Sequence, residues 1–378
     1  MNIGDKICAG AFGCTLRAAI QETNACNGAD FIEIPAGIYN LSVAGTGEDA
    51  AATGDLDITS PLTISGTDRA SVVDGNGNDR VFHSLANGPV IFSGLTIRNG
   101  NASDWPGGGG VLAATAPFGS MSLSNCEVTG NSTPYYGGGI NNHVALTVDT
   151  SVVSNNTSST VDPYGGGGIE AGSLTVRDST ISGNITVAGY GGGVECGSCS
   201  FYRSVISGNT AGINGGGINM ASGGWIENST ITGNSAAFGG AVYFGGGNGV
   251  VNSTITSNTG SSGAGGFHLG FTTIPMVNSI LAANTGPDCA GVGTLQSDGH
   301  NIDDDNSCGL SGAGDMPGTI SPVIASGAGY NGGPTQTHAL QAGSPAIDAG
   351  DNANCPATDQ RGVARSDGAC DIGAYEYP

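Results

Sequence analysis

Apolar and polar positions follow a long, regular period through the middle of the chain. Phrases such as STISGN and STITGN recur, and each ends in an asparagine that lies 24 to 28 residues after the previous one. An apolar residue stands three positions before each asparagine, and a second apolar residue follows each glycine-rich block. Both apolar columns are expected to point into a common core. The asparagines are Asn131, Asn156, Asn184, Asn209, Asn234, Asn258 and Asn284.

This period predicts an all-β fold, a parallel β-helix with one coil in each repeat of 24 to 28 residues. The repeats hold β-branched residues and glycine turns and show no helical period. Coils of a β-helix stack about 4.8 Å apart, so equivalent residues form ladders. We expect the asparagine side chains to hydrogen-bond along such a ladder, which gives them a structural role.

The two ends of the chain differ from the repeats and are expected to cover the ends of the stack. Residues 1–30 are predicted to form an N-terminal cap with a short amphipathic helix in CTLRAAIQETNAC. Residues 31–285 are predicted to form the β-helix. Residues 286–378 are rich in Asp, Gly and Cys and are predicted to fold back as an irregular, disulfide-containing C-terminal cap.

The charge of the chain excludes several kinds of partner. Nine Lys and Arg residues against 31 Asp and Glu residues give a formal net charge of -22, which repels nucleic acid and anionic lipid. No apolar run approaches the roughly 20 residues that span a bilayer, and the N-terminus lacks the apolar region of a signal peptide. We therefore expect a soluble surface, no nucleic-acid binding and no membrane-spanning segment.

Ten cysteines fall partly into short pairs without the spacing of a zinc site. Disulfides formed in an oxidising compartment are therefore expected. The sequence CGSC could also be a redox motif or two free thiols, although no βαβ pattern surrounds it. The short pairs are Cys14 with Cys26, Cys196 with Cys199, Cys289 with Cys308, and Cys355 with Cys370.

Two segments resemble a known group of proteins. CTLRAAIQETN at Cys14–Asn24 is similar to the Cys-Ser-Leu-Arg-Glu-Ala motif of bacterial surface β-helix proteins, with Thr15 for Ser and Ala18 for Glu. The tail NGGPTQTHALQAGSPAIDAGD, followed by DQRG and DGACDIGAYE, resembles the choice-of-anchor Q region of the same secreted group. The glycine-rich repeats are similar to pectate-lyase-like β-helices. The resemblance implies a right-handed parallel β-helix, export from a bacterium and a place at the cell surface; it implies no settled activity.

Candidate chemistry lies on the outer side of the glycine-rich blocks. Side chains alternate along a strand, so if Ile169 and Val194 point inward, Glu170 and Glu195 point outward one coil apart. The same outward column includes Asn141, Asn219 and His268, and aromatic residues precede the glycines. With the glycines between them, these columns predict a shallow trough that binds a polysaccharide or a cell-surface glycan. The aromatic residues are Trp105, Tyr136, Tyr164, Tyr190 and Phe238.

Several interpretations of the trough remain open at this stage. The aromatic residues could simply cover the coil corners, in which case the protein is a structural spacer. Glu170 and Glu195 could act as the catalytic carboxylates of a glycoside hydrolase, hold a calcium ion between them, or form a solvated ladder. A polysaccharide lyase needs a base and a cation, and the supply of basic residues is small, since Arg177 and Arg203 lie one column apart.

Acidic loops are the other candidates, and calcium is the one cofactor expected. The segment SDGHNIDDDNSC places Asp298, Asp303, Asp304 and Asp305 in a loop whose oxygen atoms suit a hard cation, although it is not an EF-hand loop. The segment GEDAAATGDLDIT, from Glu48 to Asp57, is a looser case. The five histidines lie in no motif with Ser or Cys, so a hydrolytic triad has no support.

Overall fold

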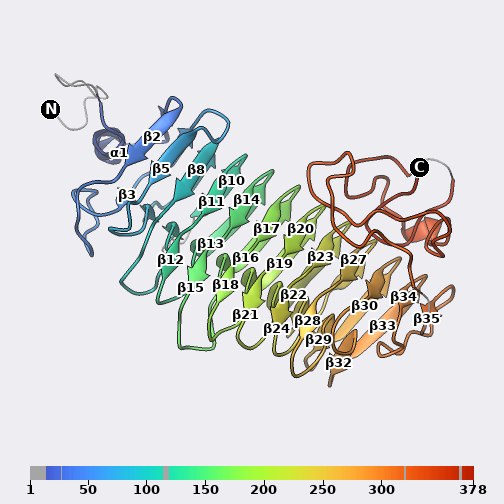
Figure 1. The fold of residues 1–378 in the computed structure, drawn as a ribbon. Helices are drawn as coiled ribbons and strands as arrows, with labels where there is room; N and C mark the ends of the chain where they lie inside the picture. The colour runs from blue at the N-terminus through green and yellow to red at the C-terminus, as the bar shows by residue number, and fades with distance from the viewer. Residues whose placement is uncertain (1–13, 27, 114–118, 319–320, 366–367) are drawn as a thin grey trace.

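The computed structural model describes residues 14–26, 28–113, 119–318, 321–365 and 368–378. Over these residues the chain winds into a right-handed parallel β-helix with a single helix at its N-terminal end (Figure 1). Successive coils lie side by side in chain order, and every pairing between the named strands is parallel. The predicted fold class is therefore confirmed. No helix in the described ranges is both long and apolar enough to cross a bilayer.

Each coil contributes strands to two or three sheets. The largest, sheet A, contains 17 strands among the described residues. Some coils add two short strands to sheet A, one after the other. In other coils these two strands are continuous and form one long strand, as in β13, β16, β19 and β22. The strands are β1 (Asp30–Glu33), β3 (Leu56–Ile58), β4 (Leu62–Ser65), β6 (Phe82–Ser84), β7 (Pro89–Ser93), β9 (Val111–Ala113), β10 (Ser120–Ser124), β13 (Ile140–Asp149), β16 (Ile169–Arg177), β19 (Val194–Tyr202), β22 (Ile218–Glu227), β25 (Val242–Phe244), β26 (Gly249–Val251), β29 (Phe267–Leu269), β30 (Thr273–Val277), β32 (Cys289–Gly291) and β33 (Thr294–Gly299).

Sheets B and C form the other two sides of the stack. Sheet B has one strand from each coil: β2 (Gly37–Asn40), β5 (Ser71–Asp74), β8 (Leu95–Arg98), β11 (Glu127–Thr129), β14 (Val152–Ser154), β17 (Thr180–Ser182), β20 (Val205–Ser207), β23 (Thr230–Thr232), β27 (Thr254–Thr256), β31 (Ile280–Ala282), β34 (Ile302–Asp303) and β35 (Met316–Pro317). Sheet C is made of β12 (Ser132–Thr133), β15 (Thr157–Ser158), β18 (Ile185–Thr186), β21 (Thr210–Ala211), β24 (Ser235–Ala236) and β28 (Thr259–Gly260).

Both predicted apolar columns are in register and form the core. In sheet A, Ile169 pairs with Val194 and Val194 with Ile218; in sheet B, Ile181 pairs with Ile206. All five side chains are fully buried. Burial of such aliphatic side chains stabilises the fold by roughly 1.5–3 kcal/mol each. The periodic apolar residues therefore act as predicted.

The asparagine ladder runs inside the corner between sheets B and C. Asn209 Oδ1 accepts from both the backbone N and the Nδ2 of Asn184, at 2.9 and 3.0 Å. Asn209 Nδ2 donates to Ile181 O and to Asn234 Oδ1. The same pattern repeats from Asn131 to Asn284. The predicted structural role of these residues is confirmed.

The glycine-rich blocks form the corner between sheets C and A, and they are buried. Gly191 has a φ of 62°, the left-handed conformation that favours glycine. A Cβ on Gly192 would lie 2.4 Å from Gly216 O and 2.5 Å from Thr210 C. The glycines therefore bring backbones of neighbouring coils together. The expectation that they leave a trough open to a ligand is wrong.

The N-terminal helix covers the first coils as predicted. Helix α1 (Leu16–Ala25) begins after Thr15, whose side chain accepts from Ala18 N, and it buries Leu16 and Ile20 against the core. The guanidinium of Arg17 donates to backbone carbonyls of the following loop at Ala51, Thr53, Gly54 and Asp55. Residues 1–13 of the expected cap lie outside the described part of the chain.

The stack continues beyond residue 285, the limit expected from the asparagine ladder. Strands β32, β33, β34 and β35 add further rungs to sheets A and B. The chain after residue 320 then returns along the outer face of sheet B, drawn in red in Figure 1. It therefore covers the side of the stack, whereas the sequence predicted a cap on its end.

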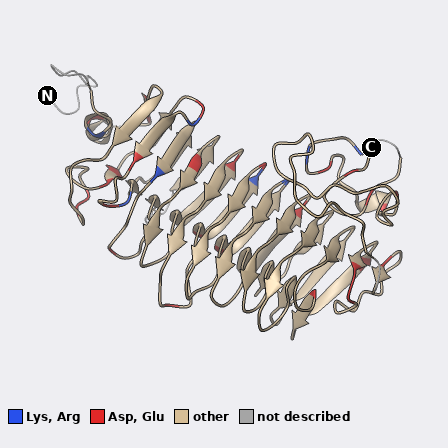
Figure 2. Ribbon diagram, viewed as in Figure 1, with Lys and Arg blue, Asp and Glu red and all other residues tan. Residues whose placement is uncertain are grey.

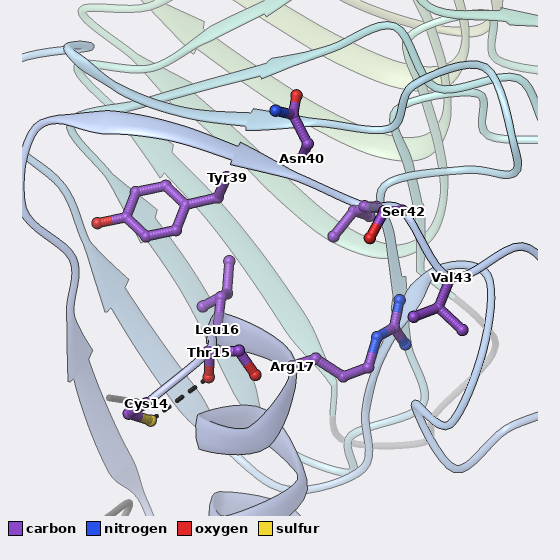
Figure 3. A pocket seen from close by; sticks show the side chains of 9 residues that line it. Cys14, Thr15, Leu16, Arg17, Tyr39, Asn40, Ser42 and Val43 are labelled. Carbon is purple, nitrogen blue, oxygen red and sulfur yellow. Dashed lines mark hydrogen bonds between the residues drawn. The ribbon is translucent and has the colours of Figure 1, made fainter. Parts of the chain in front are cut away.

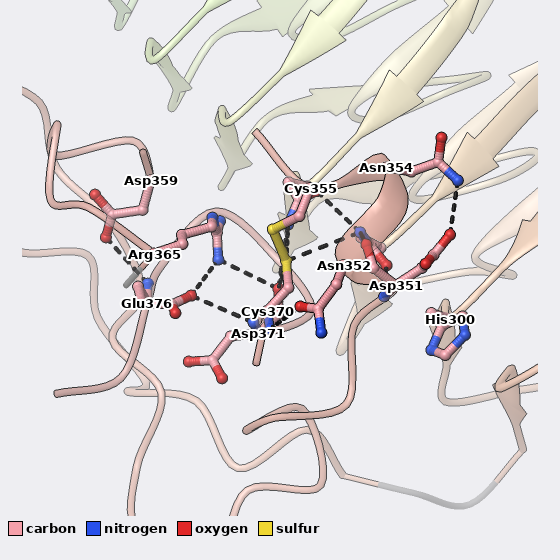
Figure 4. The surroundings of a disulfide bond; sticks show 12 residues. His300, Asp351, Asn352, Asn354, Cys355, Asp359, Arg365, Cys370, Asp371 and Glu376 are labelled. Atoms are coloured by element: carbon pink, nitrogen blue, oxygen red, sulfur yellow. Dashed lines mark hydrogen bonds and ion pairs between the residues drawn. A yellow bond between two sulfur atoms is a disulfide. The ribbon is translucent and has the colours of Figure 1, made fainter. Parts of the chain in front are cut away.

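Hydrogen bonds attach this returning segment to three consecutive strands of sheet B and their corners. Thr230 Oγ1 donates to Gln360 Oε1, Ala374 N donates to Thr254 Oγ1, and Gly373 N donates to Asn278 O. A small second core forms where Ile280 and Ile302 meet apolar side chains of the segment: Leu340, Ala346, Ile372 and Tyr375. Around the Cys355–Cys370 disulfide, Arg365 pairs with Glu376 (Figure 4).

The cysteine pairing agrees with the sequence in three of the four short pairs. Disulfides join Cys196 to Cys199, Cys289 to Cys308, and Cys355 to Cys370. Cys26 is a buried free thiol, while Cys14 is disulfide-bonded. The predicted Cys14–Cys26 pair is therefore wrong.

The close approach at the glycine corners predicts a specific loss of stability. Gly192→Ala places a methyl group against rigid backbone, so we expect the free energy of unfolding to fall by at least about 2 kcal/mol. Gly172→Ala is the matched control, because a Cβ there meets no atom within 4 Å. Denaturant unfolding of both variants checks this. Equal midpoints for the two would contradict the corner packing.

Candidate functional site

A column of mostly polar residues runs along the outer face of sheet A. Each of its members directly follows an inward apolar residue, and strand pairing puts them in register from coil to coil. We call it the outer column. It consists of Asp57 (β3), His83 (β6), Leu112 (β9), Asn141 (β13), Glu170 (β16), Glu195 (β19), Asn219 (β22), Tyr243 (β25) and His268 (β29).

The structure brings the two predicted glutamates together on adjacent rungs, but not in open solvent. Glu195 is 5% exposed and Glu170 is partly buried. Burial raises the pKa of the Tyr136 and Tyr190 phenols; Asp162 and then Glu170 add to the shift at Tyr136, and Tyr164 and then Glu195 add to it at Tyr190. The expected solvent-facing glutamate pair is therefore wrong.

Burial changes the protonation of this pair. It raises the pKa of Glu170 to about 8 and that of Glu195 to about 9, and the neighbouring Glu170 adds to the effect on Glu195. At neutral pH both groups therefore hold their protons. A retaining glycoside hydrolase needs one of its two carboxylates ionised as the nucleophile. The pair is better suited to donating and accepting hydrogen bonds.

The amides on either side of the glutamates carry oxygen atoms without a partner. Asn219 Nδ2 donates to Glu195 Oε2 at 2.6 Å, and Asn141 Nδ2 donates to Pro106 O at 2.9 Å. The buried atoms Asn141 Oδ1, Glu170 Oε2 and Asn219 Oδ1 have no hydrogen-bond partner. His268 Nδ1 on the same column also has no partner. An unpaired buried polar atom costs about 1–3 kcal/mol, so these atoms mark a place where added hydrogen-bond partners would be stabilising.

The predicted aromatic residues divide into three places. Tyr136, Tyr164 and Tyr190 flank the glutamates, with the rings of Tyr164 and Tyr190 edge to face at 6.0 Å. Further along the stack, the ring centroids of Phe238 and His268 lie 5.3 Å apart. Trp105 precedes the glycine-rich block at residues 107–110 and is 69% exposed. We call Tyr136, Tyr164 and Tyr190 the tyrosine row.

Tyr243 was missed by the sequence analysis. Its ring stacks on that of His268, with the ring centroids 5.2 Å apart and an angle of 11° between the ring planes. It directly follows the inward Val242, so the same alternation that found Glu170 and Glu195 also places Tyr243 outward. The repeat itself was therefore the signal that could have found it.

A pocket of about 420 Å³ lies at the N-terminal end of the outer column. His83 and Trp105 both line it. His83 Nδ1 lies 3.2 Å from Asp57 Oδ1 and 3.4 Å from Asp49 Oδ1. The 26-residue separation of Asp57 and His83, which is one coil, was the signal for this pair that the sequence analysis overlooked.

Arg80 lines the same pocket and forms two ion pairs. Its guanidinium binds Asp55 Oδ2 at 3.3 Å and also pairs with Asp104. Burial, with the charge of Asp57 next in importance, raises the pKa of Asp55 to about 8. Of the acidic segment predicted as a loose cation site, Asp49 and Asp57 meet His83, while Glu48 accepts bonds from backbone N–H groups.

Another pocket, of about 350 Å³, lies between α1 and β2 (Figure 3). Leu16 and Leu41 contribute apolar surface, and Tyr39 lies across from the helix. Arg17 also lines it, but its guanidinium is bound to backbone carbonyls. This pocket brings together no set of groups that could carry out a reaction.

The predicted metal loop is only partly assembled. Asp303 and Asp305 lie together, joined by Asp288 from an earlier coil. Asp304 instead accepts from Ala283 N, and Asp298 accepts from Gln296 Nε2. Burial raises the pKa of Asp288 to about 9 and that of Asp303 to about 6.

The fold is similar to that of a known enzyme. The chain superimposes on the crystal structure of pectate lyase Pel9A with a TM-score of 0.53 and 15% sequence identity, over 100% of this chain and 95% of that one. No family model matches the chain, and no curated protein matches it. At this identity the likeness shows the pectate-lyase-like β-helix fold alone.

The protonated state of Glu195 predicts a pH-dependent stability. Its pKa is higher in the folded chain than the ordinary value of 4.5, so its contribution is complete below pH 4.5 and declines as pH rises towards about 9. Glu195→Gln mimics the protonated form. We expect the free energy of unfolding of this variant to exceed that of wild type by at least about 1 kcal/mol at pH 9 and to equal it near pH 4.

Unfolding curves from pH 4 to 9 measure this difference. Glu127→Gln, on the outer side of β11 in sheet B, is the control and should follow wild type throughout. A Glu195→Gln variant that is less stable than wild type at pH 9 would mean that the carboxylate is ionised and needed in that form.

Proposed function

We propose that this protein is an extracellular β-helix protein that binds an uncharged polysaccharide along the outer column and the tyrosine row. It would serve as an adhesin or as a component of the bacterial cell envelope. The observation that carries the proposal is the set of buried, unpartnered oxygen atoms on Asn141, Glu170 and Asn219, beside the exposed ring of Tyr164.

The hydrogen-bonding pattern suits sugar hydroxyl groups. Rungs lie about 4.8 Å apart, so these side chains offer a regular series of polar groups along the stack. The amide oxygens of Asn141 and Asn219 can accept from hydroxyls. The protonated carboxyls of Glu170 and Glu195 can both donate and accept. A polymer with hydroxyls in regular order can therefore satisfy several rungs at once.

The tyrosine row suits the apolar faces of sugar rings. Tyr164 is 59% exposed, and Tyr190 supports it from the next coil. Large exposed aromatic rings that gather at one place mark interaction surfaces. The row precedes the glycine corners that lead into the outer column, so a ligand on the rings would lie next to that column.

The charge of the protein favours an uncharged ligand. The net charge is -22, and no member of the outer column is a Lys or Arg. Basic residues are sparse over the described stack, and most strands carry no charged residue (Figure 2). A polyuronate would be repelled by this field unless cations accompany it.

Disulfides support an extracellular location. Three are present among the described residues, and such bonds persist in oxidising environments. The resemblance of the tail to the choice-of-anchor Q region supports a place at the bacterial surface.

A second candidate is degradation of a polysaccharide in the pocket beside Trp105. The pairing of His83 with Asp57 favours it, because a carboxylate that orients an imidazole is a common arrangement for proton transfer. Trp105, 69% exposed, offers a ring face next to that pair. The glutamate pair, being protonated, does not support a hydrolase of the two-carboxylate type.

The binding proposal predicts a selective loss on removing the tyrosine row. We expect a panel of neutral polysaccharides to contain a ligand, and Tyr164→Ala with Tyr190→Ala to weaken its binding at least about tenfold, since aromatic contacts contribute about 0.5–1.5 kcal/mol each. Tyr330→Ala, which removes a ring of similar exposure from the segment on sheet B, should bind as wild type. Calorimetric titration measures all three.

Two results would count against it. One is a panel of neutral and anionic glycans without any ligand. The other is a ligand whose affinity is unchanged in the double variant.

The catalytic candidate makes a separate prediction. Incubation with neutral glucans, pectate and alginate should release reducing ends or unsaturated products, and His83→Gln should lower the rate at least about 100-fold. The tyrosine double variant should retain a measurable rate because its rings lie outside the pocket. Absence of product from wild type on all substrates would leave binding as the function.

A further inference from the structure

Three aspartates from two neighbouring coils meet at the C-terminal end of the β-helix. Asp288 directly precedes β32, Asp303 ends β34, and Asp305 follows two residues later. One carboxylate oxygen of each lies within 4.8 Å of the others. Asp288 is 1% exposed and Asp303 is 0% exposed, whereas Asp305 reaches the surface. The cluster is therefore buried on one side and open on the other.

Two of the buried oxygens have no partner. Asp288 Oδ2 and Asp303 Oδ1 accept no hydrogen bond, although the second oxygen of each carboxylate does. Asp288 Oδ1 accepts from Asn284 Nδ2 at 2.6 Å, and Asp303 Oδ2 accepts from Cys308 N at 2.8 Å. These bonds hold both carboxylates in place while leaving one oxygen of each available.

No positive side chain balances this charge. The ion pairs found in the described ranges all involve other carboxylates. Asp305 is also fixed by backbone donors, from Asp288 N at 3.0 Å and Ser307 N at 2.9 Å. Three carboxyl groups are therefore held together by the fold without a cation from the chain, and burial raises the pKa of Asp288, so that a proton takes the place of a counter-ion there.

We propose that Asp288, Asp303 and Asp305 bind one calcium ion. Calcium takes six to eight oxygen ligands at about 2.3–2.6 Å, so oxygens on one ion lie up to roughly 5 Å apart, which matches this cluster. The donors are carboxylates without imidazole or thiolate, which disfavours zinc. Calcium tolerates irregular geometry better than magnesium, and the exposed side at Asp305 admits the ion and its water.

The ion would fasten the last coils to one another. Asp288 is bonded to Asn284, the final member of the asparagine ladder, and it adjoins the Cys289–Cys308 disulfide. Asp303 and Asp305 lie on the coil that this disulfide reaches. Calcium at the millimolar concentrations found outside cells would therefore stabilise the end of the β-helix. This role is independent of any glycan.

The test uses the full chain freed of metal with a chelator. Titration calorimetry with calcium alone should show one binding event, and calcium at 2 mM should raise the melting temperature by several degrees, a shift expected when ligand greatly exceeds its dissociation constant. Asp303→Asn and Asp305→Asn should each weaken calcium binding at least about tenfold. Asp298→Asn, whose carboxylate lies outside the cluster, should behave as wild type.

Asp305→Asn guards against misfolding, because its side chain is exposed and its loss leaves the core intact. The proposal is overturned if wild type shows no heat of calcium binding and no thermal shift. It is equally overturned if both persist unchanged in Asp303→Asn and Asp305→Asn, since calcium would then bind elsewhere, for example at Asp49, Asp57 and His83.

Discussion

The structure depends on the side-chain ladder of asparagines inside one corner of the coil. From Asn156 onward, each amide oxygen accepts two bonds from the asparagine one coil earlier, as Asn209 does from Asn184. The ladder also needs the glycine corners, because a Cβ on Gly193 would lie 3.0 Å from Asn209 Nδ2. The asparagine side chains therefore fit only because glycine, without a Cβ, lies beside them. Together they set the register that brings Glu170 opposite Glu195 on the outer face.

The fold could be predicted where the sequence repeats. A period of one coil puts equivalent residues in contact, so the apolar columns and the ladder follow from spacing alone. The C-terminal segment could not be placed in the same way. It has no period, and its position depends on individual contacts such as Thr230 with Gln360, 130 residues apart. The Cys14–Cys26 pair was wrong for a related reason, because two cysteines that are close in the sequence need not meet in the fold.

The candidate site could be predicted in its membership but not in its environment. Alternation along strands placed Glu170 and Glu195 outward. Their burial depends on how the chain packs around them in three dimensions, which a one-dimensional pattern does not show. Burial then changes the chemistry, because a protonated carboxyl can both donate and accept hydrogen bonds, whereas an ionised one only accepts them. Asp288 was overlooked because it precedes β32, outside the acidic loop that contains Asp303.

Amide hydrogen exchange under native conditions tests most directly whether the asparagine ladder holds the fold together. The backbone N–H groups of Asn184, Asn209 and Asn234, each bonded to a side-chain oxygen of the next coil, are predicted to exchange only through global unfolding. The amides of Gly329 and Thr337 in the C-terminal segment should exchange faster, through local opening. Ladder amides that exchange as fast as those two would contradict the account.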